Sequence, residues 1–387
     1  MADALPIVIV AYNRERSLNR LLDSIAAASY PDTEIPLIIS IDHAEDNQAV
    51  VDTAMAFEWA HGEKKIIRHP ENLGLRKHVL SCASLCLEYG RVIVLEDDLY
   101  VSPHFYRFTD SALRFSANDP KIGGVSLYNH QLNVLNGLYF SPIEDGYDNW
   151  YFQFASSWGQ AWNKAQFEGF LAWYEALDTL PATIDLPEKV ASWSEKSWLR
   201  YYIAYLIKED KYFLYPKISL TTNFSDTGTH ITYSSTTFQV PYLVGTKEPQ
   251  FEFSTIGDSG AIYNAHFENT ALYGYLGMTA SQLLLDLGGT RIQKNQRFVL
   301  TKKILDFKII KAYGRYLRPI ELNILQDFPG NDFFLYDTET VVKNPNKEHF
   351  FRDTFYHLKY ITHRNSMRLF LSMTKSRIRD WMQKFKR

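Results

Sequence analysis

Arg91-Val92-Ile93-Val94-Leu95-Glu96-Asp97-Asp98-Leu99-Tyr100-Val101 is the most informative segment of this chain. Its four consecutive apolar residues predict a strand that is buried on both faces of a parallel sheet. Three carboxylates follow directly, and ligands of open α/β sheets bind at the carboxyl edge of the strands. Because adjacent acids repel one another, this edge favours a divalent cation such as Mg²⁺ or Mn²⁺, which prefers oxygen ligands. The alternative is an acidic loop that faces water.

Repeated strand and helix units lead into the acidic strand. Short apolar runs predict three earlier strands, over residues 6–12, 36–42 and 65–68. Apolar residues at helical spacing predict the helices between them: one capped by Ser17, one through 55–60 and one over 77–89. Strands that alternate with helices indicate a mostly parallel sheet with right-handed crossovers. The polar residues at the strand ends should therefore meet at one edge of this sheet.

Four motifs give the chain a family resemblance: Ala-Tyr-Asn-Arg (11–14), Ile-Ser-Ile-Asp (39–42), Asn-Leu-Gly-Leu-Arg-Lys-His (72–78) and Leu-Glu-Asp-Asp-Leu-Tyr-Val-Ser-Pro (95–103). In this order they resemble nucleotide-sugar glycosyltransferases of the GT-A fold. They are most similar to the N-acetylglucosaminyltransferase I type and to bacterial surface-polysaccharide transferases related to family 2. The resemblance covers roughly residues 5–235. It implies a GT-A fold, a Rossmann-like, mixed but mostly parallel sheet flanked by helices.

The resemblance implies a role for each motif. Asp98 would be the direct ligand of Mn²⁺ or Mg²⁺, which holds the donor diphosphate and acts as a Lewis acid. Asp97 would contact the ribose, and Asp42 the uracil edge. Arg14 and His78 would contact the base and phosphates, although a lone helical His more often satisfies a structural partner. Further contacts to the nucleotide-sugar are expected from Ala11, Asn13, Asn72 and Arg76.

Transfer with inversion needs a carboxylate that deprotonates the acceptor hydroxyl. Glu195, in Ser192-Trp193-Ser194-Glu195-Lys196-Ser197-Trp198, corresponds best to the family segment that carries this base. The family has Asp there, with closer spacing to the Trp. Asp226 is the second candidate and lies in a Gly-, Thr- and Ser-rich segment. In the same segment, His230 is expected either near the diphosphate or in a structural turn.

Residues 150–162, Trp-Tyr-Phe-Gln-Phe-Ala-Ser-Ser-Trp-Gly-Gln-Ala-Trp, form an aromatic motif. It resembles the stretch of bacterial relatives that closes over the donor and acceptor sugars. Gly159 would permit a close backbone approach, and aromatic rings suit the apolar faces of sugars. The alternative is core packing, because Trp158 and Trp162 stand four residues apart, as on one face of a helix.

Composition limits the classes of partner and compartment. The formal net charge of −3 over 387 residues argues against nucleic acid as a partner. Cys82 and Cys86 are expected to be small core residues with free thiols, as in a protein of a reducing compartment. No basic leader precedes the apolar run after Leu5, and no run is long enough to span a bilayer. These features predict a cytoplasmic, bacterial protein.

We expect three regions: a catalytic domain (1–240), an extension of unknown role (241–362) and a basic amphipathic helix (363–387). The extension is expected to be mainly helical, with a helix over 280–289 that stops at Gly. From Arg364 to Arg387, eight Lys and Arg residues stand against one acid. Apolar residues recur there at steps of three, four or seven: Met367, Leu371, Ile378, Trp381 and Phe385. Such a helix is typical of anionic membrane surfaces; the alternatives are packing on the catalytic domain and a dimer contact.

The sequence therefore predicts an inverting, metal-dependent glycosyltransferase that uses a UDP-sugar, such as UDP-N-acetylglucosamine. Its acceptor would be a glycan or a lipid-linked oligosaccharide in bacterial surface polysaccharide synthesis. One alternative is a sugar nucleotidyltransferase, but the first turn, residues 11–16, lacks the glycine of a phosphate loop. The other alternative is a noncatalytic carbohydrate-binding protein of the same fold.

Overall fold

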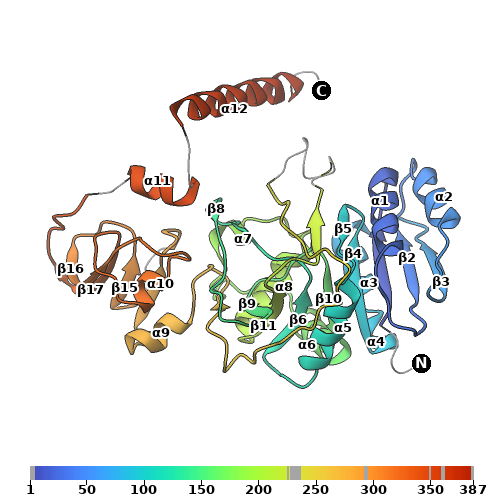
Figure 1. Ribbon diagram of the computed structural model, residues 1–387, viewed down its shortest axis with the longest axis horizontal. Helices are drawn as coiled ribbons and strands as arrows, with labels where there is room; N and C mark the ends of the chain where they lie inside the picture. Colours follow the sequence, from blue (N-terminus) through green and yellow to red (C-terminus); the bar gives the residue numbers. More distant parts are fainter. Residues whose placement is uncertain are drawn as a thin grey trace.

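The computed structural model describes residues 5–224, 226, 237–291, 295–347, 350–358 and 362–384. Within these ranges one large sheet has nine strands in the order β13-β9-β11-β6-β10-β4-β1-β2-β3 (Figure 1). In chain order they are β1 (Ile7–Ala11), β2 (Leu37–Ile41), β3 (Lys64–Arg68), β4 (Arg91–Glu96), β6 (Ile122–Ser126), β9 (Asn149–Phe152), β10 (Gln160–Asn163), β11 (Tyr212–Pro216) and β13 (Ile262–Tyr263).

The large sheet is mixed and mostly parallel. Strand β1 pairs in parallel with β2 and β4, and β2 pairs in parallel with β3. Strand β10 runs antiparallel between β4 and β6, and β9 pairs antiparallel with β11. The predicted α/β class, with helices on the faces of a mostly parallel sheet, is confirmed.

Helices cover both faces of the large sheet. Alternate residues of β4 point into different cores: Ile93 and Leu95 into one, Val92 and Val94 into the other. The first core is closed by α1 (Glu15–Ala26), α2 (Gln48–Ala56) and α5 (Phe105–Phe115). The second is closed by α3 (Gly74–Ala83), α4 (Cys86–Tyr89), α6 (Lys164–Glu175), α7 (Glu188–Ala191) and α8 (Trp198–Lys208). Burial on both faces explains the unbroken apolar run of β4.

Three predicted helix boundaries were wrong. Helix α1 begins after Arg14, so Ser17 lies inside the helix and does not cap it. Helix α2 ends at Ala56, and the next residue, Phe57, has an extended backbone. The predicted helix over 77–89 is two helices, α3 and α4, which are separated by residues 84–85. None of these differences moves the strand ends where the polar residues were expected.

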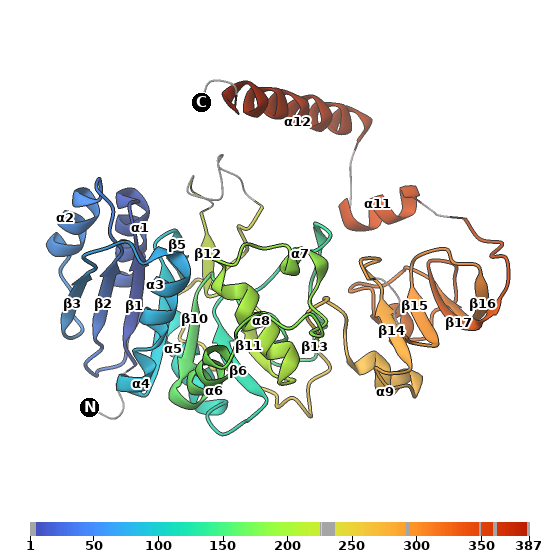
Figure 2. The same ribbon diagram turned by 180° about the vertical axis from the view of Figure 1, so that it is seen from behind.

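A second, smaller sheet lies beyond the large one, on the side away from β3 in Figures 1 and 2. Within the described ranges this C-terminal sheet has four strands in the order β14-β15-β17-β16. They are β14 (Leu283–Asp286), β15 (Phe298–Thr301), β16 (Phe307–Tyr313) and β17 (Phe333–Val341). The helix predicted over 280–289 was wrong, because Leu283, Leu284 and Leu285 form the buried strand β14. A short apolar run cannot be assigned to helix or strand by periodicity alone.

The helical C-terminal end is confirmed. Short helices α9 (Ala271–Leu276) and α10 (Leu322–Leu325) pack near the C-terminal sheet, and α11 (Phe350–Leu358) and α12 (His363–Lys384) follow it. Because β13 still pairs with β9 of the large sheet, we propose that the domain boundary lies after Tyr263 and not at residue 240. Among the described residues, no helix is both long and apolar enough to cross a bilayer.

Helix α12 stands apart from the rest of the chain in both views (Figures 1 and 2). Its apolar side chains are exposed, with Met367 60% and Phe370 67% accessible. Monomeric proteins rarely leave a continuous apolar surface in water. Helix α12 therefore presents an exposed apolar surface in the described part of the chain.

Candidate functional site

The acidic motif forms a tight turn at the carboxyl end of β4. Asp97 and Asp98 connect β4 to β5 (Leu99–Val101), which pairs antiparallel with β12 (Thr221–Asn223). The Asp97 N–H donates to the Val10 carbonyl of β1 (3.2 Å), and the Phe224 N–H donates to the Asp98 carbonyl (3.2 Å). The turn is thus held from two sides by backbone hydrogen bonds.

Arg14 brings the first predicted residues together. It follows β1 at the same edge, and its guanidinium spans both aspartates of the turn. Its Nη1 lies 3.1 Å from Asp98 Oδ2, and its Nη2 pairs with Asp97 Oδ1. Burial opposes the charge on Arg14, but the two aspartates outweigh this effect and raise its pKa. Two strand ends, from β1 and β4, therefore meet as an ionic cluster, as the sequence predicted.

The acids of this cluster are deeply set. Asp97 is 3% exposed and Asp98 16%. Burial raises the pKa of Asp97 to about 6, against the opposing effect of Arg14. Burial, followed by the nearby Asp98 charge, raises the pKa of Glu96 well above its ordinary value. Among the described residues, Glu96 Oε1 and Asp98 Oδ1 are buried and have no hydrogen-bond partner.

The cluster fits a divalent cation. Three carboxyl groups and one guanidinium carry up to two net negative charges, and Asp98 Oδ1 is an orphaned carboxylate oxygen. Hard cations such as Mg²⁺ and Mn²⁺ take such oxygens and often only one or two protein ligands. Within the described ranges, no group of three or more His, Cys, Asp or Glu side chains could hold a metal alone. Other ligands would therefore have to come from a bound diphosphate or water.

Asp42 organises the neighbouring loop. Its Oδ1 accepts from the N–H groups of His43 (2.9 Å) and Leu73 (2.8 Å), and its Oδ2 accepts from Gly74 N–H (3.0 Å). Asp42 thus satisfies the first N–H groups of α3, where a carboxylate is also favoured by the helix dipole. Asn72 Nδ2 donates to the His43 carbonyl (2.8 Å). The carboxylate predicted to meet the base holds the Asn-Leu-Gly turn in place.

His78 is buried beneath this loop. Its Nε2 lies 2.8 Å from Ser40 Oγ, which also contacts His69 Nε2 at 3.0 Å. Burial lowers the pKa of His78 to about 4, so the ring is neutral at physiological pH. A neutral, buried ring with a hydrogen-bond partner fits the structural alternative given above better than a direct phosphate contact.

Ala11, Asn13 and Arg76 lie around the same edge. Ala11 ends β1, and its carbonyl accepts from Asp42 N–H (3.0 Å). Asn13 is exposed in the turn that follows β1. Arg76, in the first turn of α3, donates through Nη1 to the Glu195 carbonyl (2.7 Å) and lies over the Tyr201 ring. This bond ties the segment of the first candidate base to α3.

The two candidate bases differ in environment. Glu195 is exposed just before α8. Asp226 accepts from Ser17 Oγ (2.8 Å) and forms an ion pair with Arg20, both on α1. Burial raises the pKa of Asp226, but the hydrogen bonds from Arg20 and Ser17 outweigh it and lower the pKa below its ordinary value. His230 lies outside the described residues.

The aromatic motif is mainly core. Trp150 and Trp162 are fully buried, and Trp162 lies in strand β10, so the helical spacing was misleading. Trp158 is half-buried against Tyr128 and Phe238. Gly159 has φ +92, and a Cβ there would lie 3.0 Å from Thr221 Cγ2. The glycine therefore serves close packing beside β12.

Two polar residues near this edge received no role from the sequence. Ser40 joins His69 and His78, and Gln160 is fully buried at the start of β10, where it is in register with Val94 of β4. Neither the Nε2 nor the Oε1 of Gln160 has a partner among the described residues. A buried, unpaired amide is costly. The sequence hinted at this site only by placing a polar residue, Gln160, between Gly159 and the apolar residues Ala161 and Trp162.

Comparison with known families agrees with the site. Residues 7–133, about a third of the chain, match the family model described as Glycosyl transferase family 2. The match includes Arg14, Asp42 and the acid turn. It confirms the resemblance seen in the sequence: this part of the chain is similar to family 2 glycosyltransferase domains. No curated protein sequence matches the chain significantly.

Solved structures include distant neighbours. S. aureus TarS 1-349 is 16% identical with a TM-score of 0.36, over 56% of this chain and 59% of that chain. The same protein in complex with UDP-GlcNAc is 15% identical, with a TM-score of 0.34, over 59% and 60%. The mannosyltransferase PcManGT from Pyrobaculum calidifontis, in complex with GDP-Man and Mn²⁺, is 15% identical, with a TM-score of 0.30, over 47% and 48%. The chain spans about three fifths of the length of TarS 1-349 and about half of the length of PcManGT. This likeness assigns neither a donor nor a metal.

Proposed function

We propose that the chain is an inverting, metal-dependent glycosyltransferase that moves a sugar from a UDP-sugar to a glycan or lipid-linked acceptor. The acid turn carries this proposal. Arg14 bridges Asp97 and Asp98 there, and Asp98 Oδ1 is buried without a partner in the described part of the chain. A buried carboxylate cluster with an orphaned oxygen, at the carboxyl edge of an α/β sheet, has the chemistry of a cation and phosphate site.

Asp98 would hold the divalent cation, with Glu96 as its buried neighbour. A bound Mg²⁺ or Mn²⁺ supplies Lewis-acid neutralisation of the charge that develops on the leaving diphosphate. Arg14 would then have a second task, since its guanidinium can contact a phosphate bidentately once a cation shares the two aspartates. Asp97, the more buried aspartate, would remain as the partner that orients Arg14.

The nucleoside would lie along the loop that Asp42 organises. Asp42 fixes this loop by two backbone hydrogen bonds, from the N–H groups of Leu73 and Gly74, and accepts a third from His43. Its effect on the base would then come through this loop, with Asn72 and the exposed Asn13 as side chains at its rim. His78, neutral and bonded to Ser40, would support the loop from below.

Glu195 is the better of the two candidate bases. It is exposed, and the bond from Arg76 to its carbonyl holds its segment against α3. Asp226 is already engaged by Arg20 and Ser17, and a carboxylate stabilised in its charged form is a weak proton acceptor. We therefore assign proton abstraction from the acceptor hydroxyl to Glu195, and to Asp226 the fixing of the segment after β12 on α1.

The test is release of UDP or GDP from a panel of nucleotide sugars, including UDP-GlcNAc and GDP-mannose. Slow hydrolysis of one UDP-sugar, dependent on Mn²⁺ or Mg²⁺ and abolished by EDTA, is the expected result. If the panel is silent, calorimetry with UDP and metal decides. Metal-dependent binding would leave only the acceptor missing, whereas no binding would contradict the proposal and favour a noncatalytic carbohydrate-binding protein.

Inversion needs its own measurement. Proton NMR of the product would show an anomeric configuration opposite to that of the donor. Retention of the donor configuration would contradict the assignment of Glu195 as a base. Formation of a nucleotide sugar from a sugar phosphate and UTP would instead identify a nucleotidyltransferase.

We also propose that helix α12 lies on an anionic membrane surface, where lipid-linked acceptors are found. Its exposed apolar residues include Met367, Phe370, Leu371 and Ile378, and the region 364–387 has an excess of basic residues. Buried apolar area and attraction to anionic lipid together drive such binding. The protein would then be peripheral, on the membrane face that carries its donor.

Vesicle sedimentation tests this placement. The full chain should bind vesicles of phosphatidylserine and phosphatidylcholine, but only weakly those of phosphatidylcholine alone. The variant M367E/L371E should lose binding, while the matched variant M55E/I218E, which adds the same two charges at exposed apolar positions outside α12, should keep it. Equal sedimentation of the wild type and M367E/L371E would contradict the membrane role.

A further inference from the structure

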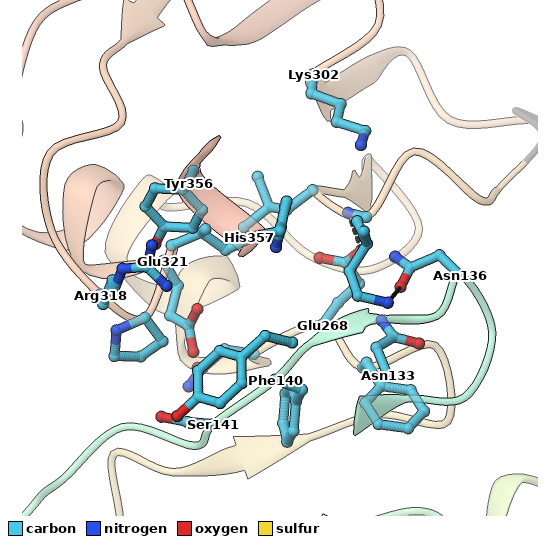
Figure 3. A pocket seen from close by; sticks show the side chains of 18 of the residues that line it. Asn133, Asn136, Phe140, Ser141, Glu268, Lys302, Arg318, Glu321, Tyr356 and His357 are labelled. Carbon is cyan, nitrogen blue, oxygen red and sulfur yellow. Dashed lines mark hydrogen bonds between the residues drawn. The ribbon is translucent and has the colours of Figure 1, made fainter. Parts of the chain in front are cut away.

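A cavity outside the acid turn lies where the catalytic region meets the C-terminal sheet (Figure 3). The hairpin of β7 (Leu132–Asn133) and β8 (Leu138–Tyr139) forms one side. The loop after β14 and the segment before α9 form the floor, and α11 with residues 315–321 forms the other side. No residue of the proposed transfer site lines this cavity.

The floor of the cavity is open at Gly288. A Cβ at this position would lie 3.3 Å from Asn136 Nδ2, 3.6 Å from Glu268 Oε1 and 3.9 Å from Asn133 Nδ2. Two amide groups and one carboxyl group therefore surround a space that any larger residue would fill. Gly288 N–H also donates to Glu268 Oε1 at 3.1 Å, which fixes the carboxyl group there.

The two amide groups are aimed by the hairpin itself. Asn133 Oδ1 accepts from Leu135 N–H (2.9 Å), and Asn136 Oδ1 accepts from Leu138 N–H (3.0 Å). These bonds leave each NH₂ group facing Gly288. Among the described residues neither Nδ2 donates a hydrogen bond, so two oriented donors are available to a ligand.

The opposite side supplies an aromatic ring and a second acid. Tyr356 donates to the Leu317 carbonyl (2.7 Å), which fixes its ring, and Arg318 lies 4.2 Å over that ring. Glu321 is buried, and its Oε1 accepts from Tyr263. Figure 3 shows Tyr356, Arg318 and Glu321 together across the cavity from Asn133, Asn136 and Glu268. Arg318 forms no ion pair in the described part of the chain.

We propose that this cavity binds a saccharide residue. Sugar hydroxyl groups both donate and accept, which suits paired amide donors and carboxyl groups. The apolar face of a sugar ring suits the edge of a partly exposed aromatic ring such as Tyr356. That the saccharide belongs to the acceptor glycan rests on the proposed function. The cavity would then hold the chain at a distance from the transfer site.

The position of the cavity supports this use. In Figure 1, β8, α7 and α11 lie on the same upper side of the molecule as β5. Figure 2 shows α7 and α11 on that side together with β5 and β12, which flank the acid turn. An extended glycan could therefore run from the transfer edge along one side of the molecule. A site that holds a remote sugar adds effective concentration at the reacting end.

Saturation-transfer NMR on the full chain tests the proposal with two defined probes. N-acetylchitotetraose is neutral, and a hyaluronan tetrasaccharide carries carboxylates that Arg318 can pair with. Saturation transfer to at least one probe is expected. The variant Gly288→Val should abolish it by filling the floor, and Asn136→Asp should weaken it about tenfold, the effect of one lost hydrogen bond. Asn136→Asp keeps the oxygen that accepts from Leu138, so the hairpin is retained.

The controls separate this proposal from the transfer function. Asp98→Ala should leave the saccharide signal unchanged but remove metal-dependent UDP binding, whereas Gly288→Val should leave UDP binding unchanged. Unchanged thermal unfolding of Asn136→Asp guards against misfolding. Binding of neither probe, or a signal that survives both Gly288→Val and Asn136→Asp, would overturn the proposal. A saccharide signal in a protein that binds no UDP would leave the cavity assigned and refute only the transferase.

Discussion

The acid turn and the cavity beside the C-terminal sheet hold buried acids in different ways. At the turn, Asp97 and Asp98 share one guanidinium, that of Arg14. In the cavity, Glu268 and Glu321 accept hydrogen bonds from Gly288 N–H and from Tyr263. The first site is built from neighbouring strand ends, and the second from segments far apart in the chain. At the acid turn the guanidinium of Arg14 compensates the negative charges of the two aspartates. In the cavity, burial favours the protonated, neutral form of the two glutamates.

This difference has a functional meaning. The pKa of Glu268 is raised to about 8 by burial and by Asp286, and that of Glu321 to about 7 by burial. Both groups then hold a proton near neutral pH and can donate to a neutral ligand. The acid turn instead keeps an orphaned oxygen beside an Arg. We expect the turn to respond to removal of charge, and the cavity to respond to pH and to shape.

Asp98→Ala should have the largest effect. Loss of the metal ligand removes several kcal/mol of transition-state stabilisation, on the order of 10³-fold in the rate of UDP release. The measurement is UDP release with saturating donor and Mn²⁺. Asp110→Ala, which removes a partly exposed acid of α5 paired with Arg91, should change the rate less than twofold. If Asp98→Ala kept a rate within tenfold of wild type, the acid turn would not depend on its charge, and the expected difference between the turn and the cavity would be refuted.

Glu195→Gln should come next. Loss of a general base costs about 10²-fold or more in the chemical step, while UDP affinity measured by calorimetry should be unchanged. Asp226→Asn is the matched control, because it alters an acid that is bound to Arg20 and Ser17. If Asp226→Asn loses more activity than Glu195→Gln at equal UDP affinity, the two roles are reversed.

Asp42→Ala should act on stability more than on chemistry. Three backbone N–H groups, of His43, Leu73 and Gly74, lose their acceptor. At about 1 kcal/mol for each, the free energy of unfolding should fall by about 3 kcal/mol. Urea unfolding measures this change, and Asp46→Ala in the same loop, which is exposed, serves as control. An unchanged midpoint of urea unfolding would mean that Asp42 does not stabilise the fold and that its carboxylate serves nucleotide binding instead.

Glu268→Gln should give the smallest effect, with a sign that depends on pH. Below pH 4.5 the Glu268 carboxyl is protonated in both states, so its contribution to stability is fully present. As the pH rises towards 8, the unfolded chain ionises while the folded chain keeps the proton, and wild-type stability falls. Gln carries no such penalty, so the variant should be more stable at pH 8, by on the order of 2 kcal/mol, and no more stable at pH 5.

Thermal unfolding at pH 5 and pH 8 checks this sign. Asp286, which raises the Glu268 pKa, and Arg291, which lowers it, stay in place in this variant. Glu175→Gln on the surface of α6 should show no difference between the two pH values. Equal stabilisation of Glu268→Gln at both pH values would show that the buried carboxyl group is not protonated in the folded protein.

The sequence predicted the first region because its signals are local. Each strand of β1 to β4 is a short apolar run, and parallel strands bring their polar ends to one edge whatever the loops do. Arg14, Asp97 and Asp98 were therefore expected together. The wrong cap at Ser17 has a tertiary cause, because its hydroxyl bonds to Asp226, more than two hundred residues away. The role of Asp42 at α3 was missed because two of its three donors, Leu73 and Gly74, lie about thirty residues further along the chain.

The second region gave no such signal. Leu283, Leu284 and Leu285 are equally compatible with a buried strand and a buried helix, and only pairing with β15 decides between them. The cavity joins Asn136, Glu268, Gly288 and Tyr356, whose spacing in the sequence follows no period. Side chains that meet through tertiary packing alone leave no motif for a single sequence to reveal.

The position of β10 has a consequence for how the chain can be divided. Strand β10, at Gln160–Asn163, covers the edge of β4 that β1 leaves free. The matched segment 7–133 ends before this strand. A fragment cut at residue 133 would expose the backbone of residues 91–94, a mostly apolar edge that templates aggregation. The smallest fragment expected to stay dispersed must therefore extend through Asn163, and during synthesis β4 stays uncapped until that residue has left the ribosome.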